Sequence, residues 1–189
     1  TVAAPCRLLP AALAAIDAGG EVWMLDSANY NTGPVTVNKA ATILAVPGAL
    51  GRLVASGGPA LTINASNTLR NLNVLPLPGS AAFNGVEVQG VDVAASLEGC
   101  DISGFDQSNG VGLKVSNQAR VDVSRSTFAR NVGGIDVDSG ARVRIADSRL
   151  IQNRAVGIQV GAETVGASTR ATLERTSILG STKAVTVLV

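Results

Sequence analysis

The chain has 189 residues, of which 46% are hydrophobic, 15% are charged and only 3% are aromatic, so it is too apolar to be a disordered protein. Histidine is absent, which excludes a Ser-His-Asp triad, a histidine base and a histidine-ligated metal site. The formal net charge is +1, aromatic rings are scarce and no apolar run approaches the ~20 residues that span a bilayer, so we expect neither a nucleic-acid partner nor membrane insertion.

The N-terminal segment has a helical pattern, unlike the rest of the chain. Apolar residues in segment 5–18 recur at helical spacing, and the Gly19-Gly20 pair that follows is typical of a helix C-terminus. We therefore expect residues 1–20 to form a helix that caps the first strand, residues 21–25.

The rest of the chain, residues 21–189, is a repeat. One short alternating motif starts at Val35, Leu61, Val86, Leu113, Ile135, Ile158 and Val185, at intervals of 26, 25, 27, 22, 23 and 27 residues. Each period contains two further short alternating stretches, such as 119–124 and 126–128. Three short strands in a period of this length are the mark of a stacked solenoid. The sequence thus predicts one domain over 1–189, an all-β right-handed parallel β-helix with about seven rungs, three short parallel sheets and the N-terminal cap helix.

Stacking predicts columns of equivalent side chains inside the solenoid, since alternate residues of a strand point inward. One inward column is expected at Val88, Val115, Val137, Val160 and Val187. A second is expected at Cys100, Ser126, Ser148 and Thr176, in which the serine and threonine hydroxyls bond along the stack or to nearby backbone. Asn131 and Asn153 are expected in tight turns, in the left-handed conformation and with stacked amides.

Four other side chains are expected to be structural. Trp23 and Tyr30 should pack near the cap. Cys6 belongs to the cap and Cys100 to a rung some distance away, so we expect their Cα atoms to exceed the ~7 Å limit for a disulfide. Cys100 should be buried and unreactive.

The opening of the chain resembles that of known proteins. The segments 4–9 (APCRLL), 11–22 (AALAAIDAGGEV) and 33–44 (GPVTVNKAATIL) are similar to the start of bacterial right-handed parallel β-helix proteins of the pectate-lyase-like superfamily. The resemblance implies this fold, a bacterial origin and export, hence a secreted or cell-surface location. It says little about chemistry, because one fold carries many functions.

A candidate site lies on the outward face of the first strand of each period. Its residues are Glu87, Lys114, Asp136, Asp138 and Gln159. Asp136 and Asp138 are two residues apart on one strand, so both point outward with a separation of roughly 7 Å. In enzymes of the superfamily this face commonly carries the sugar-binding cleft. The same residues also fit a solvated ladder of alternating charge.

Two functions are compatible with these residues. The first is a non-catalytic exported scaffold, a cell-surface or glycan-contact module with a polysaccharide as partner, no catalytic residue and no cofactor. The alternative is a polysaccharide lyase or glycoside hydrolase that acts on a uronic-acid polymer, in which Asp136 and Asp138 bind Ca²⁺ or act as an acid/base pair. The motifs typical of the superfamily's enzymes do not occur in the sequence, which favours the scaffold.

The sequence also predicts three features of the protein surface. Arg120, Arg142 and Arg170 form a column on the second strand, joined by Arg144 and, nearby, by Arg125, Arg149 and Arg154. Such a surface fits an anionic polysaccharide, but interleaved acidic residues (Asp122, Asp147 and Glu174) favour a self-neutralising surface. The polar loop 105–110 is a place where ligand contacts are usually carried. No cap follows the last rung in this sequence, so we expect a homodimer through Val185 to Val189 unless further residues cover that rung.

Overall fold

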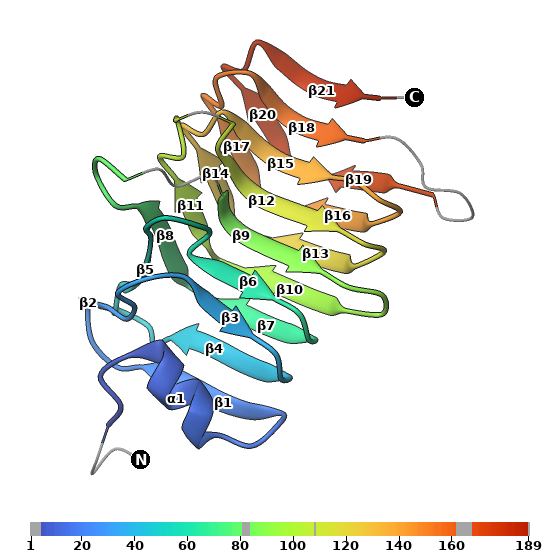
Figure 1. The fold of residues 1–189 in the computed structure, drawn as a ribbon. Helices are drawn as coiled ribbons and strands as arrows, with labels where there is room; N and C mark the ends of the chain where they lie inside the picture. The colour runs from blue at the N-terminus through green and yellow to red at the C-terminus, as the bar shows by residue number, and fades with distance from the viewer. Residues whose placement is uncertain (1–4, 81–83, 108, 162–167, 189) are drawn as a thin grey trace.

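The computed structural model describes residues 5–80, 84–107, 109–161 and 168–188, and within them the chain forms a single helix and three seven-stranded parallel sheets. Each strand pairs with the strand three places later, so three strands make one turn of a solenoid (Figure 1). The predicted all-β parallel β-helix with three short sheets is confirmed.

The sheets are named A, B and C in the order in which the chain enters them. Sheet A contains β1 (Gly20–Met24), β4 (Ala41–Ala45), β7 (Asn67–Arg70), β10 (Ala94–Glu98), β13 (Arg120–Ser124), β16 (Arg142–Ala146) and β19 (Arg170–Glu174). Sheet B contains β2 (Ala28–Asn29), β5 (Gly51–Ala55), β8 (Leu72–Pro76), β11 (Asp101–Ser103), β14 (Thr127–Ala129), β17 (Arg149–Ile151) and β20 (Ser177–Leu179). Sheet C contains β3 (Val35–Val37), β6 (Leu61–Ile63), β9 (Asn84–Gln89), β12 (Val111–Ser116), β15 (Gly133–Val137), β18 (Val156–Val160) and β21 (Lys183–Val187).

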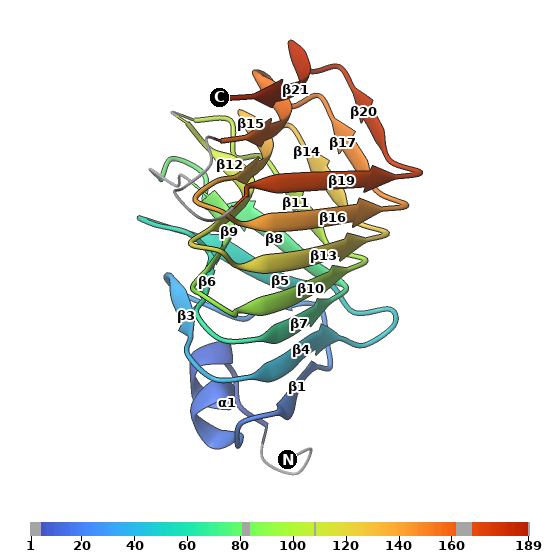
Figure 2. The ribbon, with the colours of Figure 1, turned by 90° about the vertical axis from the view of Figure 1, so that its right-hand side faces the viewer.

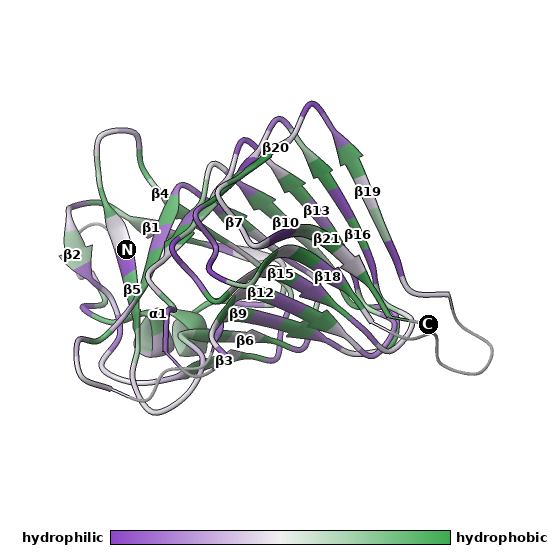
Figure 3. Cartoon of the chain, turned by 90° about the horizontal axis from the view of Figure 1, so that it is seen from above, coloured by the Kyte–Doolittle hydropathy of each residue, from purple (hydrophilic) through white to green (hydrophobic). Residues whose placement is uncertain are grey.

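The core is a stack of aliphatic side chains inside the three sheets. Hydrophobic and hydrophilic residues alternate along the strands, as Figure 3 shows from above. The register pairs the predicted valine column residue by residue, Val88, Val115, Val137, Val160 and Val187. The first four are buried, but Val187 is 63% exposed because no described coil stacks on β21.

The column of small side chains is also internal. Cys100, Ser126 and Ser148 are buried, whereas Thr176 in the last described turn is partly exposed. The Ser126 hydroxyl accepts from the Cys100 backbone N–H at 3.1 Å and donates to the Ser124 carbonyl at 2.9 Å. Neither cysteine forms a disulfide, as expected: Cys6 is exposed and Cys100 is buried. Burial raises the pKa of the Cys100 thiol to about 11, so this thiol stays protonated and unreactive.

Two buried asparagines hold successive turns together in a way that differs from the prediction. Asn131 Oδ1 accepts from the Phe105 N–H at 3.0 Å, and Asn153 Oδ1 accepts from the Asn131 N–H at 3.2 Å. The amides thus bond to the backbone of the preceding turn rather than to each other. The left-handed conformation belongs to the residues before them, Arg130 and Gln152, both with φ of 54°.

The cap helix is shorter than the expected range 1–20. Helix α1 spans Leu9–Ala15, with Pro10 in its first turn and with Leu9 and Leu13 buried against the end of the solenoid (Figure 1). It ends at Ile16 in extended conformation, so Gly19, with φ of +84°, forms the turn into β1 instead of a glycine C-cap. Residues 1–4 lie outside the described residues.

The two aromatic residues near the cap differ in burial. Tyr30 is buried and its hydroxyl hydrogen-bonds to Asp26, as expected of a packed side chain. Trp23 is 57% exposed, so its predicted packing is wrong. The reason is the alternation of β1, which turns Val22 and Met24 into the core and Trp23 to solvent.

Candidate functional site

Sheet C brings the predicted site residues onto one outward face. Glu87, Lys114, Asp136 and Gln159 are direct register partners in β9, β12, β15 and β18, so they form one row across the strands. Adjacent strands are ~4.8 Å apart, which sets the spacing of the row. Asp138 follows β15 directly, and its backbone N–H bonds to the Val115 carbonyl at 3.0 Å. The sequence therefore predicted the row and its order.

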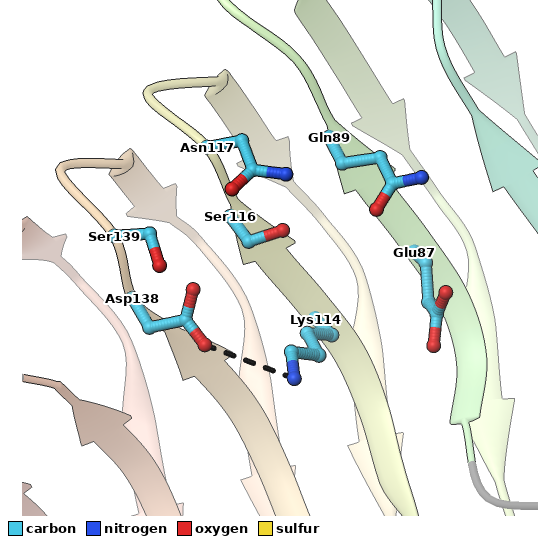
Figure 4. A pocket seen from close by; sticks show the side chains of 7 residues that line it. All are labelled: Glu87, Gln89, Lys114, Ser116, Asn117, Asp138 and Ser139. Atoms are coloured by element: carbon cyan, nitrogen blue, oxygen red, sulfur yellow. Dashed lines mark ion pairs between the residues drawn. The ribbon is translucent and has the colours of Figure 1, made fainter.

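A shallow depression of about 250 Å³ opens beside this row. Figure 4 shows its lining, in which every side chain is polar: Glu87, Gln89, Lys114, Ser116, Asn117, Asp138 and Ser139. Three of the five predicted residues therefore line the depression, while Asp136 and Gln159 lie outside its lining. Asn117 and Ser139 had not been predicted. Their signal is a polar residue in the turn that follows β12 or β15, in the left-handed conformation with φ of 54° and 53°.

One ion pair crosses the depression. Lys114 Nζ lies 3.7 Å from Asp138 Oδ2, although Asp136 is the direct register partner of Lys114 (Figure 4). The two side chains are 38% and 31% exposed, so the pair is screened by water and contributes little to stability. Both groups remain accessible to a ligand.

Asp136 is the acidic residue of the row whose negative charge is least balanced by neighbouring groups. Burial raises the pKa of its carboxyl, and the neighbouring Asp138 charge raises it further, while Lys114 and a hydrogen bond with Gln159 lower it. Among the described residues, Asp136 Oδ1 and Asp138 Oδ1 are buried without a hydrogen-bond partner. Carboxylates kept with unpaired oxygens cost stability, which is typical of functional positions.

Amide side chains extend the polar face toward the N-terminal end of the sheet. Gln89 Nε2 donates to Asn64 Oδ1 at 3.2 Å, and Asn64 Nδ2 donates to Asn38 Oδ1 at 2.9 Å. Within β9, Asn84 Nδ2 donates to Glu87 Oε1 at 2.6 Å and so orients that carboxylate. The depression thus continues into a ladder of hydrogen-bonding groups.

The donor set does not fit a calcium ion. The described residues contain no group of three or more acidic, cysteine or histidine side chains that could hold a metal. Calcium takes six to eight oxygen ligands, while this face offers the carboxylates of Asp136 and Asp138 with the Lys114 ammonium beside them.

The polar loop 105–110 is not part of the depression. Phe105 is buried, and its carbonyl accepts from the Val132 N–H at 2.8 Å, which ties the loop to the next turn. Asp106 and Gln107 are exposed but absent from the lining, and residue 108 lies outside the described residues. The expectation that ligand contacts are carried here has no support among the described side chains.

Comparison with known proteins agrees with this geometry. A family model described as the right-handed β-helix region matches residues 55–186. The chain belongs to the right-handed β-helix family. This match covers all the strands that carry the row and the depression, and it assigns the solenoid its right-handed sense. No curated protein matches the sequence. The helix that the structure describes in this β-helix is not long and apolar enough to cross a membrane.

Proposed function

We propose that this β-helix is a non-catalytic scaffold that contacts a carbohydrate through the polar face of sheet C. The observation that carries the proposal is the depression, whose lining consists of carboxylate, amide, hydroxyl and ammonium groups. Sugar hydroxyls both donate and accept hydrogen bonds, so they match such a lining. Strands paired on both sides hold these groups in place, which lowers the entropic cost of binding.

The charge of the face favours a neutral glycan. Three carboxylates lie close to the Lys114 ammonium, those of Glu87 and Asp136 in the row and that of Asp138 beside it. An added carboxylate or sulfate on the ligand would meet a surplus of negative charge, which costs affinity. The length of one sugar residue is close to the spacing between neighbouring strands. A neutral glycan that lies across the strands can therefore place one sugar residue at each side chain of the row.

A location outside the cell is part of the proposal. Its support is the resemblance of residues 4–44 to exported bacterial β-helix proteins of the pectate-lyase-like superfamily. A secreted or cell-surface scaffold with a polar sheet face would meet polysaccharides there.

Binding to neutral oligosaccharides tests the proposal. Cello-, xylo-, manno- and chito-oligosaccharides are titrated calorimetrically into the wild type and into Lys114→Gln and Asp138→Asn. At least one sugar should bind, and each variant should weaken it about fivefold through a lost charge-assisted hydrogen bond. Asp101→Asn, at the exposed first position of β11 in sheet B, is the matched control and should bind as the wild type does. Absence of binding across the panel, or an equal loss in the control, contradicts the proposal.

A second candidate function rests on the Asp136–Asp138 pair. A carboxyl with a raised pKa, such as that of Asp136, beside a second carboxyl group is the arrangement of an acid/base pair in sugar-cleaving enzymes. The candidate is a polysaccharide lyase or glycoside hydrolase acting on a uronic-acid polymer. Release of unsaturated uronate or of reducing ends from pectin, alginate or hyaluronan, abolished by Asp136→Asn, would establish it in place of the scaffold.

A further inference from the structure

Three arginines stack in register on the outside of sheet A. Arg120 in β13, Arg142 in β16 and Arg170 in β19 are direct partners in adjacent parallel strands, and all three are exposed. These strands face the viewer in Figure 2. At the strand spacing of ~4.8 Å, the three residues form a row of like charge, here called the arginine ladder. Like charges directly opposite one another destabilise a sheet.

The acidic residues near the arginine ladder are engaged by other arginines. The ion pairs are Arg144–Glu174 at 2.6 Å, Arg175–Asp147 at 2.6 Å, Arg70–Glu98 at 3.0 Å and Arg125–Glu98. Within the described ranges, no ion pair or side-chain hydrogen bond involves the arginine ladder. Asp147 and Glu174 thus neutralise Arg175 and Arg144, so the expected self-neutralisation holds for the neighbouring arginines and does not extend to the arginine ladder.

Asp122, the third of these acids, lies beside Arg144. Its register partner on β16 is Arg144, and its charge adds to that of Glu174 in raising the pKa of Arg144. The arginine ladder thus keeps its donors free while the surface around it is balanced.

We propose that the arginine ladder binds a linear anionic polysaccharide with one carboxylate or sulfate group for each rung. A guanidinium presents a planar fork that binds carboxylate and sulfate in a bidentate manner. A bound anion on each rung would remove the repulsion within the row. This surface lies on sheet A and does not depend on the depression of sheet C.

The regular spacing favours a polysaccharide over the other polyanions. The repeating unit of a polysaccharide is one sugar residue, and its length is close to the distance between adjacent strands. A nucleic-acid strand in a duplex advances ~3.4 Å per phosphate, which does not match the ladder. Binding of single strands relies on aromatic rings that stack on bases, and the strands that carry the ladder contain none.

The test compares two triple variants that remove the same charge. Heparin and polygalacturonate provide the sulfate and carboxylate ligands, dextran is the neutral control, and a poly(dT) oligonucleotide and phosphatidylserine vesicles are competitors. The first variant replaces Arg120, Arg142 and Arg170 by Gln, and the second replaces the exposed Arg130, Arg149 and Arg154 by Gln. At low salt the first should weaken binding of at least one polysaccharide by about tenfold or more, and the second by less than about threefold.

Binding should also weaken as salt is added. Tighter binding of heparin would identify sulfate as the preferred anionic group, and tighter binding of polygalacturonate would identify carboxylate. Equal losses in the two triple variants, no binding of either polysaccharide, or tighter binding of poly(dT) or of the vesicles would each overturn the proposal. Lys114→Gln and Asp138→Asn should leave heparin binding unchanged, and the ladder variant should leave neutral oligosaccharide binding unchanged. The two surfaces are thereby judged separately.

Discussion

Asp136 is held in its partly buried position at a cost in stability. Its carboxyl pKa is raised mainly by burial and then by Asp138. A pKa that is higher in the folded than in the unfolded state gives stability that is fully present below the unfolded pKa and is lost as pH rises through the folded pKa. At neutral pH the charged carboxylate therefore destabilises the fold.

Asp136→Asn should raise the free energy of unfolding at pH 7 by up to about 1 kcal/mol, a value limited by solvent screening of this partly exposed group. The gain should shrink as the pH is lowered, because the wild-type carboxyl then becomes protonated. Urea unfolding at pH 4, 5.5 and 7 measures this, with Asp101→Asn as control. A variant less stable than the wild type at pH 7 would contradict the assignment.

The buried asparagines set the energetics of the turns between sheets B and C. Asn131 Nδ2 donates to the Ile102 carbonyl at 3.2 Å, and its Oδ1 accepts from the Phe105 N–H. Asn131→Ala should destabilise the protein by about 2–4 kcal/mol, because it leaves these two buried backbone groups without partners. The exposed Asn38→Ala should change stability by no more than about 0.5 kcal/mol. Chemical unfolding of both variants checks this, and equal small effects would show that the amides are dispensable.

Strand register was predictable from the sequence because equivalent positions of a solenoid stack on one another. The row from Glu87 to Gln159 follows from this rule. In most repeats a glycine directly precedes the motif, for a steric reason that only the three-dimensional structure shows. A Cβ on Gly134, for example, would lie 2.9 Å from Asn153 Nδ2 of the next turn.

Other details of the site depend on side-chain geometry that repeat spacing does not specify. Lys114 pairs diagonally with Asp138 rather than with its register partner Asp136, since a long side chain reaches several neighbours on a sheet face. Asn117 and Ser139 lie in the turn after each strand, where the side-chain direction depends on left-handed backbone angles. The exposure of Trp23, in contrast, could have been predicted from the sequence, because buried and exposed residues alternate along β1.

At the scale of the whole molecule, the two ends of the described solenoid differ. Helix α1 covers the N-terminal end, while the last described turn exposes apolar side chains, namely Leu173, Leu179, Val185, Val187 and Leu188. β19, β20 and β21 are edge strands of their sheets. Exposed apolar edges favour pairing with another chain.

Where no further residues cover this turn, we propose that a second copy of the chain does so in a two-fold arrangement, through the segment Val185 to Val189 (Val189 itself lies outside the described residues). Head-to-tail stacking is disfavoured because α1 covers the other end, whereas a two-fold contact closes. Sedimentation at micromolar concentration should show a dimer, and Val187→Lys should shift it to monomer by placing a charge in the contact. A wild type that stays monomeric at 19.0 kDa would contradict the proposal.

The central claim is that the polar face of sheet C contacts a carbohydrate, and mapping of amide shifts by NMR tests it most directly. The ¹⁵N-labelled protein is titrated with the neutral oligosaccharide of the panel that binds most tightly. The largest changes should fall on the amides of Gln89, Lys114, Ser116 and Asp138, with small changes on sheet B. Changes concentrated on sheet A or sheet B, or none at saturating sugar, would contradict the claim.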